Sequence, residues 1–409
     1  MPPGGAVLIP ATIGRMPFGH SVRDRWMLDP TITYLNHGTV GAVPRKVLAV
    51  QQALRDEMER QPSRFLLREV YPLVGAERPN ISRMRQAAAG VGAAIGARGE
   101  DLVFVDNATA GVNVVLRSLR FESGDEILVT DHAYPTTGWI AQFVAKASGA
   151  TVRTVAVPYP RFDRVELVER VAAALSARTR LAVLDHVTSE SALILPLEEL
   201  AACCRDRGVP VLVDAAHAPG MLPLHLDAIG VDWYAANLHK WAHAPRSCGI
   251  LWARADRQAG LHPPVISWGL DKGFTGEFDW VGTRDPTPWL AAPAGFEFLE
   301  ELGGATARQY NHDLAWRAAV ELTARWGTTL DRDEASVGSM VTLPLPAPLG
   351  ATIEDAARLR DSLLADDRIE VQTYAGHGRL WVRISAQVYN DWSDIERLDA
   401  AIGRRAGPA

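Results

Sequence analysis

The sequence predicts an α/β fold, with a large domain built on a mostly parallel sheet and a smaller C-terminal α+β domain. Two patterns carry this prediction. Between residues 102 and 213, short apolar runs alternate with amphipathic stretches of helical period, which is typical of a parallel sheet with helices on both faces. Beyond about residue 295 this alternation stops, and helical stretches mix with strands. The chain has 409 residues, 47% of them hydrophobic, which is enough to bury two cores.

Each expected element follows from the spacing of apolar residues. Two helices, at 45–60 and 80–95, precede the first strand. The alternating region is expected to hold strands at 102–105, 126–130, 152–157, 181–184 and 211–213, with helices at 109–118, 137–147, 164–175 and 197–207. The C-terminal part is expected to hold helices at 294–302, 313–325 and 353–364 and strands at 339–343 and 380–384.

Changes in composition along the chain predict three regions. Residues 1–30 are rich in Pro and Gly and are expected to form an irregular N-terminal arm. Residues 31–295 are expected to form the large domain, with their N-terminal segment contributing to the small domain, and residues 296–409 to form that small domain. A glycine cluster at Gly90–Gly96 resembles a dinucleotide-binding fingerprint, but it follows no strand and lies in an Ala-rich helix. We expect these glycines to allow close helix packing instead.

Charge and composition exclude several classes of function. The net charge is −6 and the pI about 6.0, without a basic stripe or polybasic run, so we expect neither a nucleic-acid nor a membrane partner. No run approaches the 18 or so apolar residues of a transmembrane helix. The N-terminus lacks the features of a signal peptide. The three cysteines show no disulfide or metal-binding spacing, which favours a reducing, cytoplasmic location.

The two most informative segments are Val211–Gly220 and Trp233–Trp241. The first is a short apolar strand that ends in Asp214, and the second is an apolar run that leads to Lys240. A buried carboxylate and a lysine at the ends of two strands are what pyridoxal phosphate (PLP) requires. The lysine holds the aldehyde as a Schiff base, and the carboxylate pairs with the pyridinium nitrogen. We therefore predict PLP as the cofactor, with Lys240 and Asp214 as catalytic residues.

The number of lysines supports this choice. Arginine cannot form the Schiff base, and only four of the 42 basic residues are lysines. Lys46 opens an exposed-looking helix, Lys146 lies in an amphipathic helix, and Lys272 lies in a Gly-rich loop. Only Lys240 follows an apolar strand, so the pattern selects it.

Other residues at strand ends are candidates for the same site. After strand 102–105, Asn107 and Thr109 can cap the next helix, bind a phosphate, or do both. After the following strand, Tyr134 or His132 could stack on a pyridine ring, or either could be a turn aromatic that packs under a helix. The segment 185–189 places hydroxyl groups and a histidine beside the same pocket.

Arg383 is a charge on an otherwise apolar strand. A buried arginine needs an anion, which is either the α-carboxylate of a substrate or an internal Asp or Glu. The histidines do not indicate a metal site. His239 and His243 have helical spacing, but the glutamate of the zinc-protease motif is absent, and the other histidines lie on separate segments. We predict no metal.

Five short motifs occur together in this chain. They are Asn36–His37–Gly38, Asn107–Ala108–Thr109, Asp214–Gly220, His239–Lys240–Trp241 and Gly282–Thr283–Arg284–Asp285. Together they resemble the class V aminotransferase group of fold-type I PLP enzymes. The further segments 35–44, 61–66 and 267–269 resemble the isopenicillin N epimerase branch of that group. The resemblance covers about residues 28–300 and, more weakly, the C-terminal domain; it is specific for fold and cofactor but not for the reaction.

The resemblance implies roles for the residues that match these motifs. Lys240 would also shuttle protons, and His217 would lie near the phenolic oxygen of the cofactor. Thr109, the backbone at Ala108, and His239 would hold the phosphate.

The same resemblance leaves one assignment open and adds an assembly. Tyr134 matches the stacking position of kynureninase-like members, whereas His132 matches it in the desulfurase alignment. The family forms homodimers with shared active sites, and Thr283 matches the position that reaches the phosphate of the neighbouring chain. Arg383 matches the arginine that binds the substrate carboxylate. Further substrate contacts are expected from three residues of the matching motifs: Asn36, His37 and Arg284.

One departure from the family narrows the chemistry. Cysteine desulfurases of this class carry a nucleophilic cysteine on a loop before the carboxylate-binding arginine. The corresponding segment here, Tyr374–Arg379, has none, and Cys248 lies on a strand after the lysine. Persulfide chemistry is therefore not expected.

The remaining chemistry begins at the Cα of an amino acid, through an external aldimine and a carbanion, with Lys240 as the base. We predict a carbon–sulfur β-lyase that acts on an S-substituted cysteine conjugate in specialised metabolism, such as antibiotic biosynthesis, because expulsion of a β-sulfur requires only this lysine. An amino-acid epimerase is the first alternative and requires a second acid: Tyr134, His132 or His37. A decarboxylation-coupled oxidative deaminase is another alternative, and a PLP-fold regulator or scaffold is the non-enzyme alternative.

Overall fold

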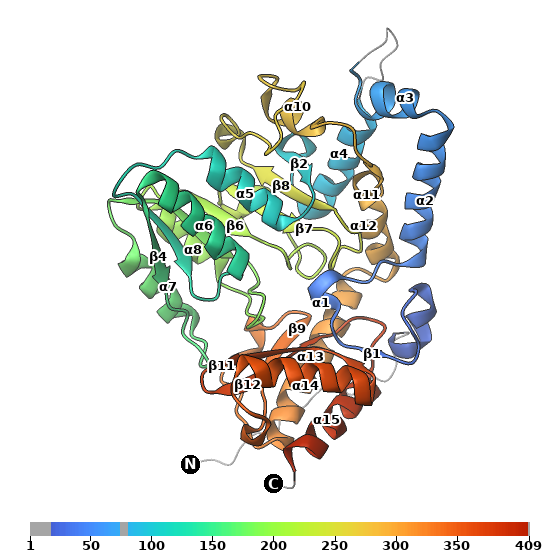
Figure 1. Cartoon of the computed structure of the whole chain (residues 1–409), viewed down its shortest axis with the longest axis vertical. Coiled ribbons are helices and arrows are strands. Elements are labelled where there is room, and N and C mark those ends of the chain that lie inside the picture. The colour runs from blue at the N-terminus through green and yellow to red at the C-terminus, as the bar shows by residue number, and fades with distance from the viewer. Residues whose placement is uncertain (1–17, 74–80, 408–409) are drawn as a thin grey trace.

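Seven strands form the central sheet of the computed structural model, in the order β2-β8-β7-β6-β5-β3-β4 (Figure 1). The structure describes residues 18–73 and 81–407. The strands are β2 (Leu102–Val105), β3 (Glu126–Thr130), β4 (Thr151–Val155), β5 (Thr179–Asp185), β6 (Val211–Asp214), β7 (Trp233–Asn237) and β8 (Gly249–Ala253). Strand β8 runs antiparallel to β2 and β7, and the four other neighbouring pairs are parallel. The predicted α/β class with a mostly parallel sheet is confirmed.

Two layers of helices cover the faces of this sheet. The covering helices are α4 (Arg83–Ile95), α5 (Ala108–Ser118), α6 (Pro135–Ser148), α7 (Arg164–Ala174) and α8 (Leu197–Arg205). Leu102 and Phe104 of β2 belong to the apolar core that β2 shares with α4, α7 and α8. Val103 and Val105, which alternate with them, belong to the core shared with α5 and α6. Strands buried on both faces explain why the sequence shows continuous apolar runs.

The second part of the molecule lies below the large sheet in Figure 1 and is built on a three-stranded antiparallel sheet. Its elements are β9 (Met340–Pro344), β11 (Gln372–Gly376), β12 (Arg379–Ser385), α13 (Ala305–Arg325), α14 (Ile353–Asp367) and α15 (Trp392–Ala406). Strand β1 (Thr33–Tyr34) pairs in parallel with β10 (Ile369–Glu370). Near the N-terminus, Val22 and Trp26 are buried in the same apolar core as β9 and β12.

Further helices lie in the described part of the chain. They are the 3₁₀ helix η2 (Gly19–Arg25), α1 (His37–Val40), α2 (Arg45–Arg60), α3 (Pro62–Arg64), α9 (Leu226–Ile229), α10 (Gly273–Asp279), α11 (Thr287–Leu290) and α12 (Ala292–Glu301). No helix in the described part of the chain is both long and apolar enough to cross a membrane.

The structure differs from the expected elements in a few places. Helix α6 begins at Pro135, two residues early, because proline is favoured in the first turn of a helix. Helix α13 begins at Ala305 instead of residue 313, and α15 and β11 were not expected. Residues 1–17 of the expected arm lie outside the described residues, but Trp26 is only 1% exposed and donates through Nε1–H to the carbonyl of Ala42. Gly92 packs closely, since a Cβ there would lie 2.7 Å from the carbonyl oxygen of Ala97.

Candidate active site

A cavity of about 220 Å³ lies where the carboxyl ends of β5, β6 and β7 meet the N-terminal ends of α5 and α6. This edge is where ligands bind in open α/β sheets. The cavity is lined by Thr39, Asn107, Ala108, Thr109, Tyr134, Asp185, Val187, Ser189, Asp214, Ala216, His217, Asn237, His239 and Lys240. Residues far apart in the sequence that were predicted to share a site therefore surround one space.

Lys240 is the one lysine or arginine among the residues that line the cavity. Its Nζ lies 3.2 Å from Nε2 of His217. Burial and the positive charge of Arg383 lower the pKa of Lys240 to about 7, against the raising effect of Asp214. Burial also lowers the pKa of His217 well below its usual range, so this imidazole is neutral. Its Nδ1 accepts a hydrogen bond from the indole N–H of Trp241 over 3.4 Å, so Nε2 carries the proton and can donate to the neutral amine. A buried amine with this pKa is a nucleophile and a base at neutral pH.

Asp214 stands at the end of β6 and is held by two hydrogen bonds. The hydroxyl of Thr137 donates to Oδ2 over 2.7 Å, and the backbone N–H of Ala216 donates to Oδ1 over 3.2 Å. Burial raises the pKa of Asp214, while these hydrogen bonds and Lys240 oppose that shift. No lysine or arginine nitrogen of the described residues lies within 4.0 Å of this carboxyl group. A buried carboxylate with hydrogen bonds but without a cation fits a cationic ring nitrogen.

Asp185 is a second carboxyl group in the cavity, and the sequence analysis did not single it out. It is the register partner of Asp214 on the adjacent strand β5 and is 3% exposed. Burial and the charge of Asp214 raise the pKa of Asp185 well above its usual range. Thr137 was likewise missed. Asp185 had a signal in the sequence, because it ends an apolar strand in the same way as Asp214.

The helix start at α5 forms another wall of the cavity. Asn107 caps the helix, because its Oδ1 accepts a hydrogen bond from the N–H of Ala110 over 2.9 Å. The N–H of Ala108 donates to Oδ1 of Asn237 over 2.8 Å, so this predicted phosphate donor is engaged within the protein. Thr109 lines the cavity beside it. The positive end of α5 and the hydroxyl of Thr109 fit an anionic group.

His239 lines the cavity as predicted, on the segment that follows β7. Its Nδ1 lies 3.1 Å from the carbonyl oxygen of Cys248, so Nδ1 is the protonated nitrogen and Nε2 is the free one. Burial lowers the pKa of His239 to about 4. The ring therefore enters the site in its neutral form.

The two stacking candidates are placed differently. Tyr134 lines the cavity directly before α6, with 42% of its surface exposed. His132 does not line this cavity but an adjoining one, where its Nδ1 lies 2.7 Å from Oγ of Ser191. Burial lowers the pKa of His132 to about 4.

Arg383 on β12 is 1% exposed and lies directly behind two lining residues. It donates through Nη1 to the carbonyl oxygen of Ser189 over 2.7 Å and through Nη2 to Oγ1 of Thr39 over 2.8 Å. Its Nε has no partner, and no carboxylate of the described residues lies within 4.0 Å of the guanidinium. Oδ1 of Asn36 accepts a hydrogen bond from the hydroxyl of Thr39, and the amide N–H of Asn36 donates to Oε1 of Glu370. A buried arginine without an internal anion fits the carboxylate of a ligand.

Besides His132, Arg383 and Asn36, three more predicted site residues are absent from the lining of the cavity that contains Lys240. The imidazole of His37 is fully buried, with Nε2 3.0 Å from the carbonyl oxygen of Lys240 and Nδ1 2.9 Å from the hydroxyl of Tyr389. It supports the backbone of the lysine from behind. The guanidinium of Arg284 lies 3.9 Å from the ring centroid of Trp289, in the wall of a separate cavity. Thr283 precedes it on an exposed loop.

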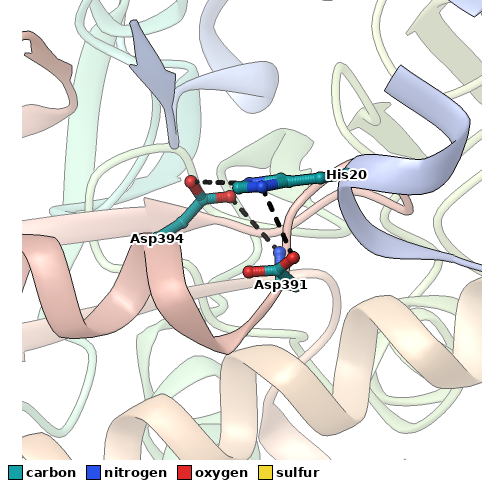
Figure 2. Close-up of side chains that lie close together, drawn as sticks. All are labelled: His20, Asp391 and Asp394. Atoms are coloured by element: carbon teal, nitrogen blue, oxygen red, sulfur yellow. Dashed lines mark hydrogen bonds and ion pairs between the residues drawn. The ribbon is translucent and has the colours of Figure 1, made fainter. Parts of the chain in front are cut away.

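One group of side chains in residues 18–73 and 81–407 has the spacing of a metal site, and none of the predicted site residues belongs to it. Figure 2 shows this group, which consists of His20, Asp391 and Asp394. His20 Nε2 lies 3.1 Å from Oδ1 of Asp394, and both aspartates form the capping box of α15. The carboxylates thus already accept hydrogen bonds from the helix start. The group ties the N-terminal segment to α15.

The model of the aminotransferase class V family matches residues 73–398. The chain belongs to this family. A probable chloroplastic L-cysteine desulfhydrase of Arabidopsis thaliana is 34% identical, over 91% of this chain and 83% of its own length. Isopenicillin N epimerase of Streptomyces clavuligerus is 36% identical, over 94% of this chain and 98% of its own length.

Solved structures share the fold of this class V aminotransferase family member. A mutant of the C-DES protein, with glycine covalently linked to its PLP cofactor, has a TM-score of 0.74 at 24% identity and covers 91% of this chain and 96% of its own. The predicted family and the fold-type I class are confirmed. The family is PLP-dependent, so the chain is a PLP-dependent enzyme, as the two strand-end residues Asp214 and Lys240 indicated.

Proposed function

We propose that this chain is a carbon–sulfur β-lyase that releases a thiol from an S-substituted cysteine. The cavity lined by Lys240 and Asp214 is named the catalytic cavity. The observation that carries the proposal is the single amine in this cavity: Lys240, with a pKa of about 7, beside the neutral His217. Elimination of a β-sulfur needs one base at Cα and no further acid for the sulfur, because a thiolate leaves as an anion. The names of relatives support this chemistry, since one is an L-cysteine desulfhydrase.

The residues of the cavity divide into three tasks. When bound, PLP delocalises the negative charge that develops at the substrate Cα. We propose that Lys240 binds its aldehyde, Asp214 holds its ring nitrogen in the protonated form, and Thr109 and His239 bind its phosphate. Thr137 keeps the carboxylate of Asp214 oriented toward the ring.

The substrate is held by different groups. We propose that Arg383 binds the α-carboxylate, because it is buried without an internal carboxylate and lies behind Thr39 and Ser189 in the cavity wall. Lys240 then removes the Cα proton, and the electron pair of that C–H bond forms the new double bond as the C–S bond breaks. The sulfur leaves with its electron pair as a thiolate, and reaction with water yields pyruvate and ammonia.

Epimerisation remains the second candidate because isopenicillin N epimerase is a relative. An epimerase must return the proton to the other face of Cα, which requires a second acid. Of the three predicted acids, only Tyr134 lines the catalytic cavity, whereas His132 lines the adjoining cavity and His37 lies behind Lys240. Tyr134 is therefore the residue on which the choice between the two reactions depends.

The test is a proton NMR time course of the holoenzyme in deuterated water with a panel of S-substituted cysteines and long-chain amino acids. Release of pyruvate together with a free thiol supports the lyase. Loss of the Cα proton signal with an intact carbon skeleton would instead support the epimerase. Loss of the carboxylate with consumption of oxygen would support the oxidative deaminase.

We propose further that the active protein is a homodimer with shared sites. Thr283 is exposed and does not line the cavity of its own chain, which fits a role in the phosphate site of a neighbouring copy. We also propose the cytoplasm as its location, because Cys203, Cys204 and Cys248 are all free.

A further inference from the structure

A second cavity, of about 240 Å³, adjoins the catalytic cavity. Tyr134 and Ser189 line both, so one bound molecule can extend through the two spaces. The walls of the second cavity come from the segments after β3 and β5, from β9, and from the hairpin of β11 and β12. Both parts of the molecule thus contribute to it.

Arg383 connects the two cavities. Its guanidinium donates to the carbonyl of Ser189, which lines both, and it lies 5.8 Å from the ring centroid of Tyr374, which lines the second. A substrate with its carboxylate at Arg383 and its amino group at Lys240 fills the catalytic cavity with its reacting end. The second cavity is then the adjoining space for the S-substituent.

Aromatic rings dominate the second cavity. The ring of Tyr159 lies at the centre of the group, 4.9 Å from His132, 5.1 Å from Trp381 and 5.2 Å from His377 between centroids. All four rings line the space, and Tyr374 and Tyr134 add two more. The face of such a ring carries partial negative charge and attracts a cation.

The charged groups that line the second cavity are acidic. They are Asp131 and Glu190, and no lysine or arginine belongs to the lining. Burial raises the pKa of Glu190, while Arg383 opposes that shift, so a cation beside this carboxyl group would favour its ionised form. The half-buried His132 has a pKa of about 4 and adds no positive charge at neutral pH.

Two arginines lie behind the walls without facing this space. Arg332 donates to the carbonyl of Ser191 over 2.9 Å and to the hydroxyl of Tyr159 over 3.3 Å, 5.4 Å from the centroid of that ring. The other is Arg383, whose charge a substrate carboxylate would neutralise. With that carboxylate in place, Asp131 and Glu190 face the cavity, while Arg332 is engaged with Ser191 and Tyr159 behind its wall.

We infer that the second cavity binds the S-substituent of the substrate and selects a substituent with a positive charge, such as a quaternary ammonium group. This inference rests on the proposed lyase function. Acidic side chains and ring faces would disfavour a carboxylate at the same position, because its charge would meet Asp131 and Glu190.

The test uses three cysteine conjugates of similar length. They are S-(2-trimethylammonioethyl)cysteine, its uncharged isostere S-(3,3-dimethylbutyl)cysteine, and S-(2-carboxyethyl)cysteine. The measurements are kcat/KM from pyruvate release and Kd for binding to the holoenzyme. We expect the cation to be preferred over the uncharged isostere by roughly 2- to 30-fold, and the carboxylate to be the poorest of the three.

One variant and one control variant test whether Glu190 causes the preference for the cationic conjugate. Glu190→Gln removes a lining charge and should reduce the ratio between the cation and the isostere, because it should weaken binding of the cation more than binding of the isostere. The matched control is Glu198→Gln, on the exposed surface of α8, which should leave the ratio unchanged. Equal binding of the cation and the isostere, or an unchanged ratio in Glu190→Gln, would overturn the inference. If no conjugate yields pyruvate but Kd still follows the expected order, the proposed lyase function fails and the cavity assignment stands.

Discussion

The amine of Lys240 should be chemically ready at neutral pH, and the apoprotein offers a direct test. Burial and the charge of Arg383 lower its pKa from 10.5 to about 7, against the effect of Asp214. At pH 7 about half of such amines are neutral, compared with about one in 3,000 for a lysine with its ordinary pKa. The rate at which apoprotein combines with PLP should therefore rise about tenfold between pH 6 and pH 8 and then level off.

Stopped-flow absorbance of the lysine adduct measures this rate, with free butylamine as a reference for the ionisation of PLP itself. Lys240→Ala should form no adduct, whereas Lys146→Ala should behave as wild type. Because Arg383 lowers the pKa of Lys240 and Asp214 raises it, Arg383→Gln should move the midpoint to higher pH and Asp214→Asn to lower pH.

Two results would refute this reasoning. A rate that keeps rising tenfold per pH unit up to pH 10 would mean that Lys240 behaves as an ordinary exposed lysine. Midpoints that move in the same direction in both charge variants would mean that charge does not set the pKa of the amine.

Three further outcomes follow from the same contacts. Asp214→Asn should lower kcat by about 10²- to 10³-fold. Asp185→Asn should change kcat by less than about fivefold, because burial and the charge of Asp214 raise the pKa of Asp185 and so disfavour its ionised form; steady-state kinetics of both variants test this difference. Refolded one-to-one mixtures of inactive Lys240→Ala and Thr283→Ala chains should recover about a quarter of wild-type activity if sites are shared between subunits, because about half of the dimers are mixed and one of the two sites in each mixed dimer keeps both native residues. Activity no higher than that of the single variants would contradict shared sites. Because the pKa of His37 in the folded protein is below its ordinary 6.5, its contribution to the free energy of unfolding is complete above pH 6.5 and is lost as the pH falls. Urea unfolding between pH 7.5 and 5 should therefore show a smaller loss of unfolding free energy for His37→Gln than for the wild type, and equal losses in the two proteins would contradict this prediction.

The sequence predicted that Asp214 and Lys240 share one cavity, because burial leaves a readable pattern. Asp214 and Lys240 each follow an apolar run, and a polar group at the end of a buried parallel strand lies at the edge where ligands bind. The mostly parallel sheet was predictable for the same reason. Local alternation of apolar strands and amphipathic helices is visible in one sequence, without knowledge of long-range contacts.

The partners of these residues were not predictable in the same way. Thr137 reaches Asp214 across 77 positions of the chain, and Asn237 reaches Ala108 across 129. A threonine in the first turn of a helix has many common roles, so its residue type alone does not indicate this contact. The position of His37 behind Lys240 is also a tertiary fact, because the motif that contains it has no local pattern that separates a ligand contact from a buried support.

The placement of titratable groups explains how one scaffold can support different reactions. The catalytic cavity holds the amine of Lys240 and the carboxyl group of Asp214, and Arg383 lies behind its lining residues Thr39 and Ser189. In the proposed function these groups would activate Cα, but they would not choose the fate of the charge that forms there. That choice depends on whether a second acid reaches Cα and on what the neighbouring cavity holds. Tyr134 stands at the boundary of both cavities. If the Tyr134→Phe variant still releases thiol, one base is sufficient for the reaction. If this variant still exchanges the Cα proton with solvent but no longer inverts the configuration at Cα, Tyr134 is the second acid of an epimerase.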